Sequence, residues 1–117
     1  MGKTTTFRVV GVSFVEGYPT NLHTLREVDN ERIQRGESLP AILIRDPDNA
    51  YDANAIEVHS PAVGRIGSVP RHHAEWLAPL LDGEERWAAE IDFVAVDPDH
   101  PDRPGIDITI HPIKEQP

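Results

Sequence analysis

Residues 44–58 read Ile-Arg-Asp-Pro-Asp-Asn-Ala-Tyr-Asp-Ala-Asn-Ala-Ile-Glu-Val, and this stretch decides how the chain folds. Alternating apolar residues at its two ends indicate a pair of β-strands. A tight hairpin needs only Asn-Gly or Asp-Gly at its turn, but six hydrogen-bonding or aromatic side chains fill this one. They are Asp46, Asp48, Asn49, Tyr51, Asp52 and Asn54. Such a loop either folds itself with these side chains or binds a ligand with them.

The loop residues divide by what their side chains can do locally. Asparagine side chains hydrogen-bond neighbouring backbone amides, so Asn49 and Asn54 can shape the loop or contact a ligand. Tyr51 and Asp52 are harder to explain as loop formers. An aromatic face beside a carboxylate, on a loop at the end of strands, suits stacking on a flat ligand while accepting a hydroxyl proton.

Length and composition restrict the class of protein. A chain of 117 residues fits one domain, expected over residues 1–117, with its core at about 7–112 and a frayed tail at 113–117. No stretch approaches the ~18 apolar residues of a membrane span, and the start lacks a signal-peptide pattern, so we expect a cytoplasmic protein. The absence of cysteine excludes a thiol nucleophile, a thiolate zinc site and a disulfide framework.

The formal net charge of −9 is unevenly distributed along the chain. Residues 1–45 hold six Lys/Arg against five Asp/Glu, whereas residues 82–117 hold three against ten. Affinity for nucleic acid comes mainly from cations that neutralise phosphates, so the total predicts weak, salt-sensitive binding. The arginines that could still line one basic groove are Arg8, Arg45, Arg65 and Arg71.

Apolar patterning along the chain predicts a mainly β protein. The expected strands cover residues 7–14, 39–45, 54–59, 65–69, 87–96 and 106–110, the last two joined by a polar loop at 97–105. A surface helix is expected at 22–33, and a second helix over 71–81 that Pro79 kinks or shortens. Because this order lacks the regular crossovers of a parallel sheet, we expect a small antiparallel β-barrel of five to six strands with two short helices.

Three segments together resemble a HIRAN domain, over roughly residues 7–96. They are VGVSF at 10–14, the loop with its flanks at 45–58, and GRIGSVP at 64–70. The resemblance, to a stand-alone bacterial or phage-type member, implies an OB-like barrel that binds single-stranded DNA. In some members the domain captures 3′-hydroxyl ends at damaged DNA or stalled replication forks. This sequence has no ATP-binding P-loop, so a helicase or ATPase would be a separate partner.

The resemblance also assigns roles to single residues. Phe14 and Tyr51 match aromatic positions that stack on terminal bases, where stacking contributes roughly 1 to 3 kcal/mol per base. Asp52 matches the carboxylate that accepts from the 3′-hydroxyl, and it would repel an end that carries a 3′-phosphate. Asn49 matches a loop asparagine near the strand end. Such a site reads an end and not a sequence.

Two serines and three arginines are the remaining predicted DNA contacts. Ser13 and Ser68 occupy places where end-binding members carry an arginine and a histidine. Arg45, Arg65 and Arg71 are the cations that could replace those contacts with phosphate.

Competing functions have less support in the sequence. An enzyme would use Asp52 as a base beside His59 or His111, but no nucleophile, oxyanion donor or phosphate cradle accompanies them. A calcium loop would need glycine where Tyr51 stands. We therefore expect a non-catalytic domain without metal or other cofactor. The alternative is a protein-interaction adaptor with an acidic surface and little DNA affinity. The partner and the oligomeric state do not follow from the sequence.

Two tryptophans and a histidine pair are further candidates for ligand-binding groups. Trp76 and Trp87 could stack on bases, but their apolar neighbours favour packing in the core or at its rim. His72 and His73 begin the second expected helix without a further ligand one turn away, so a metal site is not expected there.

Overall fold

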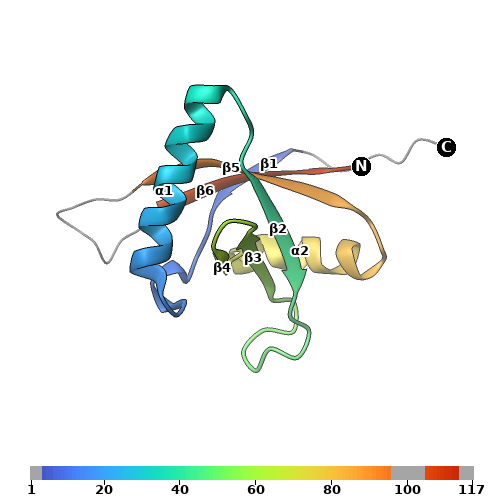
Figure 1. Ribbon diagram of the computed structural model, residues 1–117. Helices are drawn as coiled ribbons and strands as arrows, with labels where there is room; N and C mark the ends of the chain where they lie inside the picture. The colour runs from blue at the N-terminus through green and yellow to red at the C-terminus, as the bar shows by residue number, and fades with distance from the viewer. Residues whose placement is uncertain (1–3, 96–104, 114–117) are drawn as a thin grey trace.

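The computed structural model of the protein describes residues 4–95 and 105–113. Within them, six strands, two α-helices and one 3-10 helix follow one another along the chain (Figure 1). The elements are β1 Thr5–Arg8, η1 Val12–Phe14, α1 Tyr18–Arg35, β2 Pro40–Arg45, β3 Ile56–Ser60, β4 Gly64–Ser68, α2 Arg71–Asp82, β5 Trp87–Ala95 and β6 Gly105–Pro112. The predicted polar loop at 97–105 and tail at 113–117 lie almost wholly outside the described residues.

The strands form one antiparallel sheet in the order β1-β6-β5-β2-β3-β4, and it curls so that its two edges meet. The contact between the edges is a bridge in which Val10 N–H donates to Ser68 O and Ser68 N–H donates to Val10 O, both at 2.9 Å. The predicted OB-like antiparallel barrel with two helices is thereby confirmed.

Gly67 allows this close approach of the two edges. Its φ of 152° is one that residues with a side chain rarely adopt. In addition, a Cβ atom at this position would lie 2.4 Å from Val9 Cγ1 and 2.7 Å from Val10 O. Only glycine fits such a contact without moving the backbone. The second glycine of the Gly-x-x-Gly segment at 64–67 is therefore required by the close contact between the two sheet edges.

The barrel interior is filled by alternate residues of the strands. Ile106, Ile108 and Ile110 of β6 are almost fully buried, as are Ile56 and Val58 of β3. Burial of an aliphatic side chain of this size stabilises the fold by roughly 1.5–3 kcal/mol. The period-two pattern of β6 therefore determines which of its faces packs inward.

The alternation predicted for β5 breaks at a β-bulge. Ile91 pairs with Ile108 but Phe93 pairs with Asp107, so Asp92 is the extra residue. Beyond the bulge Val94 points into the core, while Phe93, predicted to alternate inward, is 50% exposed. A bulge inserts one residue and exchanges the two faces of the strand after it.

The first strand is shorter than predicted. It was expected to continue to Phe14, but β1 ends at Arg8 and Gly11 takes a left-handed conformation with φ of 71°. Between Arg8 and Gly11 the chain changes its pairing partner. Val9 N–H still donates to Ile106 O of β6 at 2.8 Å, whereas Val10 already pairs with Ser68 of β4. The turn after this change forms η1, not a further strand.

Helix α1 is longer than the predicted 22–33, because glycines at both ends, Gly17 and Gly36, set its limits in left-handed conformations. Leu22 and Leu25 pack inward as expected, but Ile33 is exposed. Asp29 is buried instead, with 2% of its surface exposed. Among the described residues, no helix has the length and hydropathy to cross a bilayer.

Arginine side chains attach α1 to β5. Arg32 Nε donates to Asp29 Oδ1 at 2.7 Å and its Nη2 donates to Asp92 O at 2.6 Å, and Arg26 Nη1 donates to Val94 O at 2.8 Å. β5 pairs with β2 only near Pro40, so the helix supplies donors to the later part of that strand edge. Covering a strand edge in this way prevents pairing with another chain.

Helix α2 begins directly after Pro70 and packs Ala74, Leu77 and Ala78 against the core. Pro79 does not shorten it, since the helix continues to Asp82. In Figure 1 the segment between β2 and β3 projects as a loop from the ends of these strands. This loop and the first residue of α2 carry much of the candidate site.

Candidate functional site

Asn49 builds the loop at residues 46–55. Its Oδ1 accepts from the backbone N–H groups of Tyr51 at 2.9 Å and Asp52 at 3.1 Å, and its Nδ2 donates to Asp46 Oδ2 at 3.0 Å. These are local contacts of the kind that asparagine makes in turns. The loop-forming interpretation of Asn49 is confirmed, and its contact with DNA stays a prediction.

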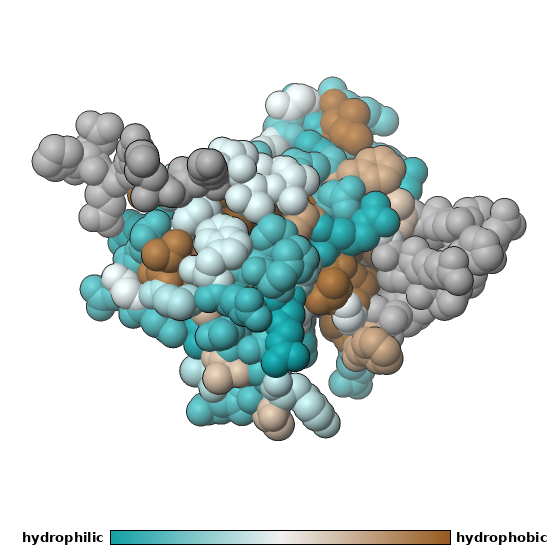
Figure 2. Space-filling view, turned by 180° about the vertical axis from the view of Figure 1, so that it is seen from behind, coloured by the Kyte–Doolittle hydropathy of each residue, from teal (hydrophilic) through white to brown (hydrophobic). Residues whose placement is uncertain are grey.

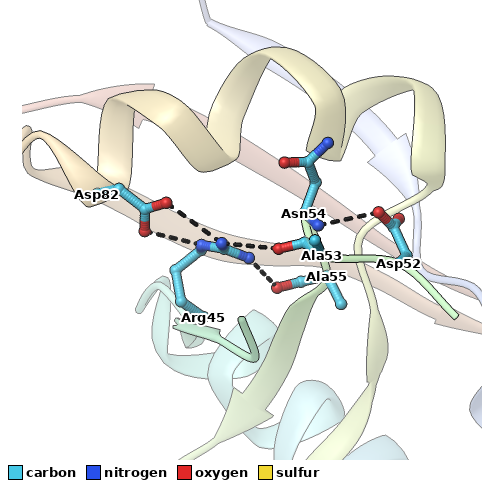
Figure 3. Close-up of polar contacts among 6 residues, drawn as sticks. All are labelled: Arg45, Asp52, Ala53, Asn54, Ala55 and Asp82. Carbon is cyan, nitrogen blue, oxygen red and sulfur yellow. Dashed lines mark hydrogen bonds and ion pairs between the residues drawn. The ribbon is translucent and has the colours of Figure 1, made fainter. Parts of the chain in front are cut away.

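Asp52 is held in place through one carboxylate oxygen, and its side chain is 22% exposed. Its Oδ1 accepts from Asn54 N–H at 2.9 Å (Figure 3). Its Oδ2 lies 3.9 Å from Nε of Arg71, which is the first residue of α2. The second distance is too long for a direct hydrogen bond. Asp52 Oδ2 can therefore accept from a ligand beside a guanidinium. We call Asn49, Tyr51, Asp52 and Arg71 the loop cluster.

Arg45 has a role in the fold that the sequence did not indicate. Its Nε donates to Asp82 Oδ1 at 2.9 Å, its Nη1 to Ala55 O at 2.6 Å and its Nη2 to Ala53 O at 2.8 Å (Figure 3). The hydrogen bond from Arg45 lowers the pKa of the Asp82 carboxyl below its ordinary value. The guanidinium is thus engaged within the protein, and the predicted contact of Arg45 with phosphate stays untested.

A second group of predicted residues surrounds β4. Arg65 Nη2 donates to Ser68 Oγ at 3.3 Å, and its Nη1 lies 3.9 Å from Glu57 Oε2. Phe14 stands at the edge of an open hollow of about 330 Å³ that Val63 and Arg65 also line. Ser13 precedes Phe14 in η1. We call Phe14, Arg65 and Ser68 the β4 cluster.

The pairing of β3 with β4 connects the two clusters. Ser68 pairs with Glu57, and Val69 N–H donates to Ile56 O at 3.0 Å, directly after the last loop residue. Pro70 and Arg71 follow without a gap. The predicted site residues therefore come from five segments: η1, the end of β2, the loop, β4 and the start of α2.

Glu57 and His59 are not among the predicted DNA contacts. His59 Nε2 lies 2.9 Å from Glu57 Oε1, and the other Glu57 oxygen faces Arg65. Both side chains lie on the outward face of β3, and the alternation of apolar Ile56 and Val58 with Glu57 and His59 could have located them there. The carboxylate of Glu57 partly neutralises the β4 cluster.

Aromatic exposure distinguishes the site from the rest of the fold. Tyr51 is 90% exposed and Phe14 91% exposed, so the core uses neither ring. The surface seen from behind is mostly hydrophilic, with hydrophobic residues scattered over it (Figure 2). In the described part of the chain no three His, Cys, Asp or Glu side chains gather to hold a metal ion.

Fold and site together define a small OB-like β-barrel domain with exposed aromatic and charged side chains beside β4. The chain belongs to the HIRAN domain family, because the model of that domain matches residues 3–96. The resemblance inferred from the segments at 10–14, 45–58 and 64–70 is confirmed.

Solved structures share this fold. A protein from Lactobacillus plantarum superposes with a TM-score of 0.69 at 22% identity, covering 96% of this chain and 97% of that chain. The crystal structure of the HIRAN domain of human HLTF gives 0.62 at 18%, covering 93% and 74%. The NMR structure of the HLTF HIRAN domain in its DNA-bound conformation gives 0.57 at 19%, covering 93% and 73%. No curated protein matches the sequence.

Proposed function

We propose that this protein is a non-catalytic module that binds single-stranded DNA and captures its 3′-hydroxyl end. The observation that carries the proposal is the exposure of Tyr51 and Phe14, two aromatic rings that pack against nothing in the core. Stacking on such rings contributes roughly 1–3 kcal/mol per base and does not depend on sequence. A family relative, the HLTF HIRAN domain, has a DNA-bound conformation, which supports the same ligand class here.

Asp52 is the group proposed to recognise the 3′-hydroxyl. Its Oδ1 is fixed by Asn54 N–H, and its Oδ2 faces Arg71 at 3.9 Å. A hydroxyl could donate to Oδ2 while the adjacent guanidinium contacts the last phosphate. A terminal 3′-phosphate would bring a negative charge against the Asp52 carboxylate. Recognition is therefore proposed to depend on the chemistry of the end.

Arg65 and Arg71 are the proposed phosphate contacts. The side chain of Arg71 is 74% exposed, and that of Arg65 is also accessible. Ser68 is proposed to donate its hydroxyl group nearby, and Arg45 and Asn49 to support the site from within the fold. The contact of Ser13 with DNA stays a prediction, because its side chain lies outside the described part of the structure. Because each arginine also faces a carboxylate, we expect weak binding at physiological salt.

Fluorescence anisotropy with a short single-stranded oligonucleotide tests the proposal. The oligonucleotide is prepared with a free 3′-hydroxyl and with a 3′-phosphate. We expect tighter binding of the hydroxyl form, and we expect Asp52→Asn to remove the preference. Tyr51→Ala should weaken both forms by about tenfold. Asp48→Asn removes a charge from the same loop and serves as the matched control.

The outcomes separate the parts of the proposal. Equal affinity for both ends, unchanged by Asp52→Asn, would leave strand binding and reject end capture. Negligible binding of either form at low salt would reject the DNA function. Any helicase or ATPase activity at damaged DNA or stalled forks is proposed to belong to a separate partner protein.

A further inference from the structure

The only two tryptophans of the chain lie side by side at the surface, and neither is a member of the loop cluster or the β4 cluster. Trp76 of α2 and Trp87 at the start of β5 have ring centroids 5.5 Å apart with an interplanar angle of 59°. Trp76 is 37% exposed, and Trp87 is partly buried against the core. We call this pair the tryptophan surface. Its partly exposed rings take no part in the proposed DNA site.

Hydrogen bonds and ring contacts hold both indoles. Trp76 Nε1 donates to His73 Nδ1 at 3.3 Å, and Trp87 Nε1 donates to Glu85 Oε1 at 3.1 Å. His73 in turn stacks on Phe7, with centroids 5.2 Å apart. Because the indole N–H groups are engaged, the rings offer mainly their faces and edges to a ligand. Held rings lose little freedom on binding, which favours affinity.

The sequence that carries the pair is acidic. Residues 75–90 contain five carboxylates and one arginine, a net charge of −4. The carboxylates are Glu75, Asp82, Glu84, Glu85 and Glu90, of which Asp82 is bonded to Arg45. Glu75, Glu84 and Glu85 are exposed. This field attracts cations and repels phosphates.

Aromatic faces within a negative field bind guanidinium and ammonium groups, and tryptophan is the most favourable ring for this contact. We propose that the tryptophan surface docks a basic peptide segment of a partner protein. An arginine or lysine of the segment lies against Trp76 and Trp87, and neighbouring cations face Glu75 and Glu85. This inference goes beyond the proposed DNA function and does not depend on it.

Intrinsic fluorescence tests the inference directly, since both tryptophans of the protein lie at the surface in question. The probe is an acetylated and amidated Gly-Arg-Gly-Arg-Gly-Arg-Gly peptide, and the matched control peptide has glutamine in place of arginine. At low salt we expect a saturable change in emission with the arginine peptide and none with the glutamine peptide.

Paired variants test the charge contribution. Glu75→Gln with Glu85→Gln should weaken peptide binding by about fivefold or more. Glutamine at position 85 can still accept from Trp87 N–H, so the ring position is preserved. Glu27→Gln with Glu31→Gln makes the same charge change on exposed positions of α1 and should alter binding by less than about twofold. Trp76→Leu should abolish binding in a protein whose circular dichroism is unchanged.

Three results would overturn the inference: equal titration by both peptides, equal loss in the two paired variants, or competition for the surface by a single-stranded oligonucleotide. The last result would assign the tryptophan surface to nucleic acid. Tyr51→Ala should leave the peptide titration unchanged, so failure of the DNA function is distinguishable from failure of this one.

Discussion

Arg45 and Asp82 join the beginning of the candidate-site loop to the end of α2. Arg45 Nε donates to Asp82 Oδ1 at 2.9 Å, while the other nitrogens of the guanidinium donate to carbonyl groups at the far side of the loop. One side chain therefore sets the position of the loop against both the strand and the helix. Tyr51 and Asp52 depend on it although it contacts neither.

Replacing Arg45 should loosen the loop. Arg45→Ala removes charged donors from the carbonyl oxygens of Ala53 and Ala55, and we expect it to lower the free energy of unfolding by about 1–3 kcal/mol. Arg45→Lys keeps the charge but not the planar fork, so it should restore only part of the loss. Urea denaturation measures both. Full rescue by lysine would show that charge alone suffices.

The same pair makes stability depend on pH in the acid range. The hydrogen bond from Arg45 lowers the pKa of Asp82 in the folded state, so the unfolded state binds protons first as pH falls. The stabilisation is present above the ordinary carboxyl pKa of about 4 and is lost as pH falls through the folded-state value. Melting temperatures between about pH 3 and 6 should fall less steeply for Asp82→Asn than for the unchanged protein.

Gly67 should be intolerant of any side chain. Its Cβ would meet Val9 Cγ1 at 2.4 Å and Val10 O at 2.7 Å, so Gly67→Ala forces apart the strands that close the barrel. We expect a loss of about 3 kcal/mol or more in the free energy of unfolding. Gly64→Ala is the matched control, because its φ of 84° is also left-handed but its Cβ meets open space. It should cost only about 1–2 kcal/mol. Similar losses for both variants would reject the steric explanation.

The ion pair on α1 between buried Asp29 and partly buried Arg32 should be sensitive to removal of one partner. Arg32→Ala leaves Asp29 buried without its guanidinium and removes a donor from Asp92 O. We expect destabilisation of about 3 kcal/mol, and a smaller effect when Asp29→Asn is added. Chemical denaturation of the two variants checks this order. Arg35→Ala, exposed at the end of the same helix, should change stability by less than about 0.5 kcal/mol.

Salt dependence should reveal how few phosphates the protein contacts. If Arg65 and Arg71 each neutralise one phosphate of a single strand, the logarithm of the binding constant falls with the logarithm of salt concentration with a slope of about −1.4. Arg65→Gln or Arg71→Gln should reduce the slope to about −0.7. Titrations at several salt concentrations measure it. An unchanged slope in both variants would place the phosphate contacts elsewhere.

Local patterns predicted the fold wherever packing follows the strand period. Ile106, Ile108 and Ile110 alternate inward as expected, and the family segments located the loop. The pattern failed at Phe93, because the bulge at Asp92 exists only where β5 meets β6. It also failed at Phe14, since the first strand ends where the chain crosses from one sheet edge to the other.

The candidate site shows the same division. Asn49 and Asp52 shape the loop through partners two or three residues away, so the local sequence is enough to specify those contacts. Arg45 contacts Asp82, which lies 37 residues further along the chain, and Trp76 of α2 contacts Trp87 at the start of β5. The spacing of these residues in the sequence does not predict either contact. They follow from closure of the barrel, which brings distant segments together because the buried faces of its strands must share one core.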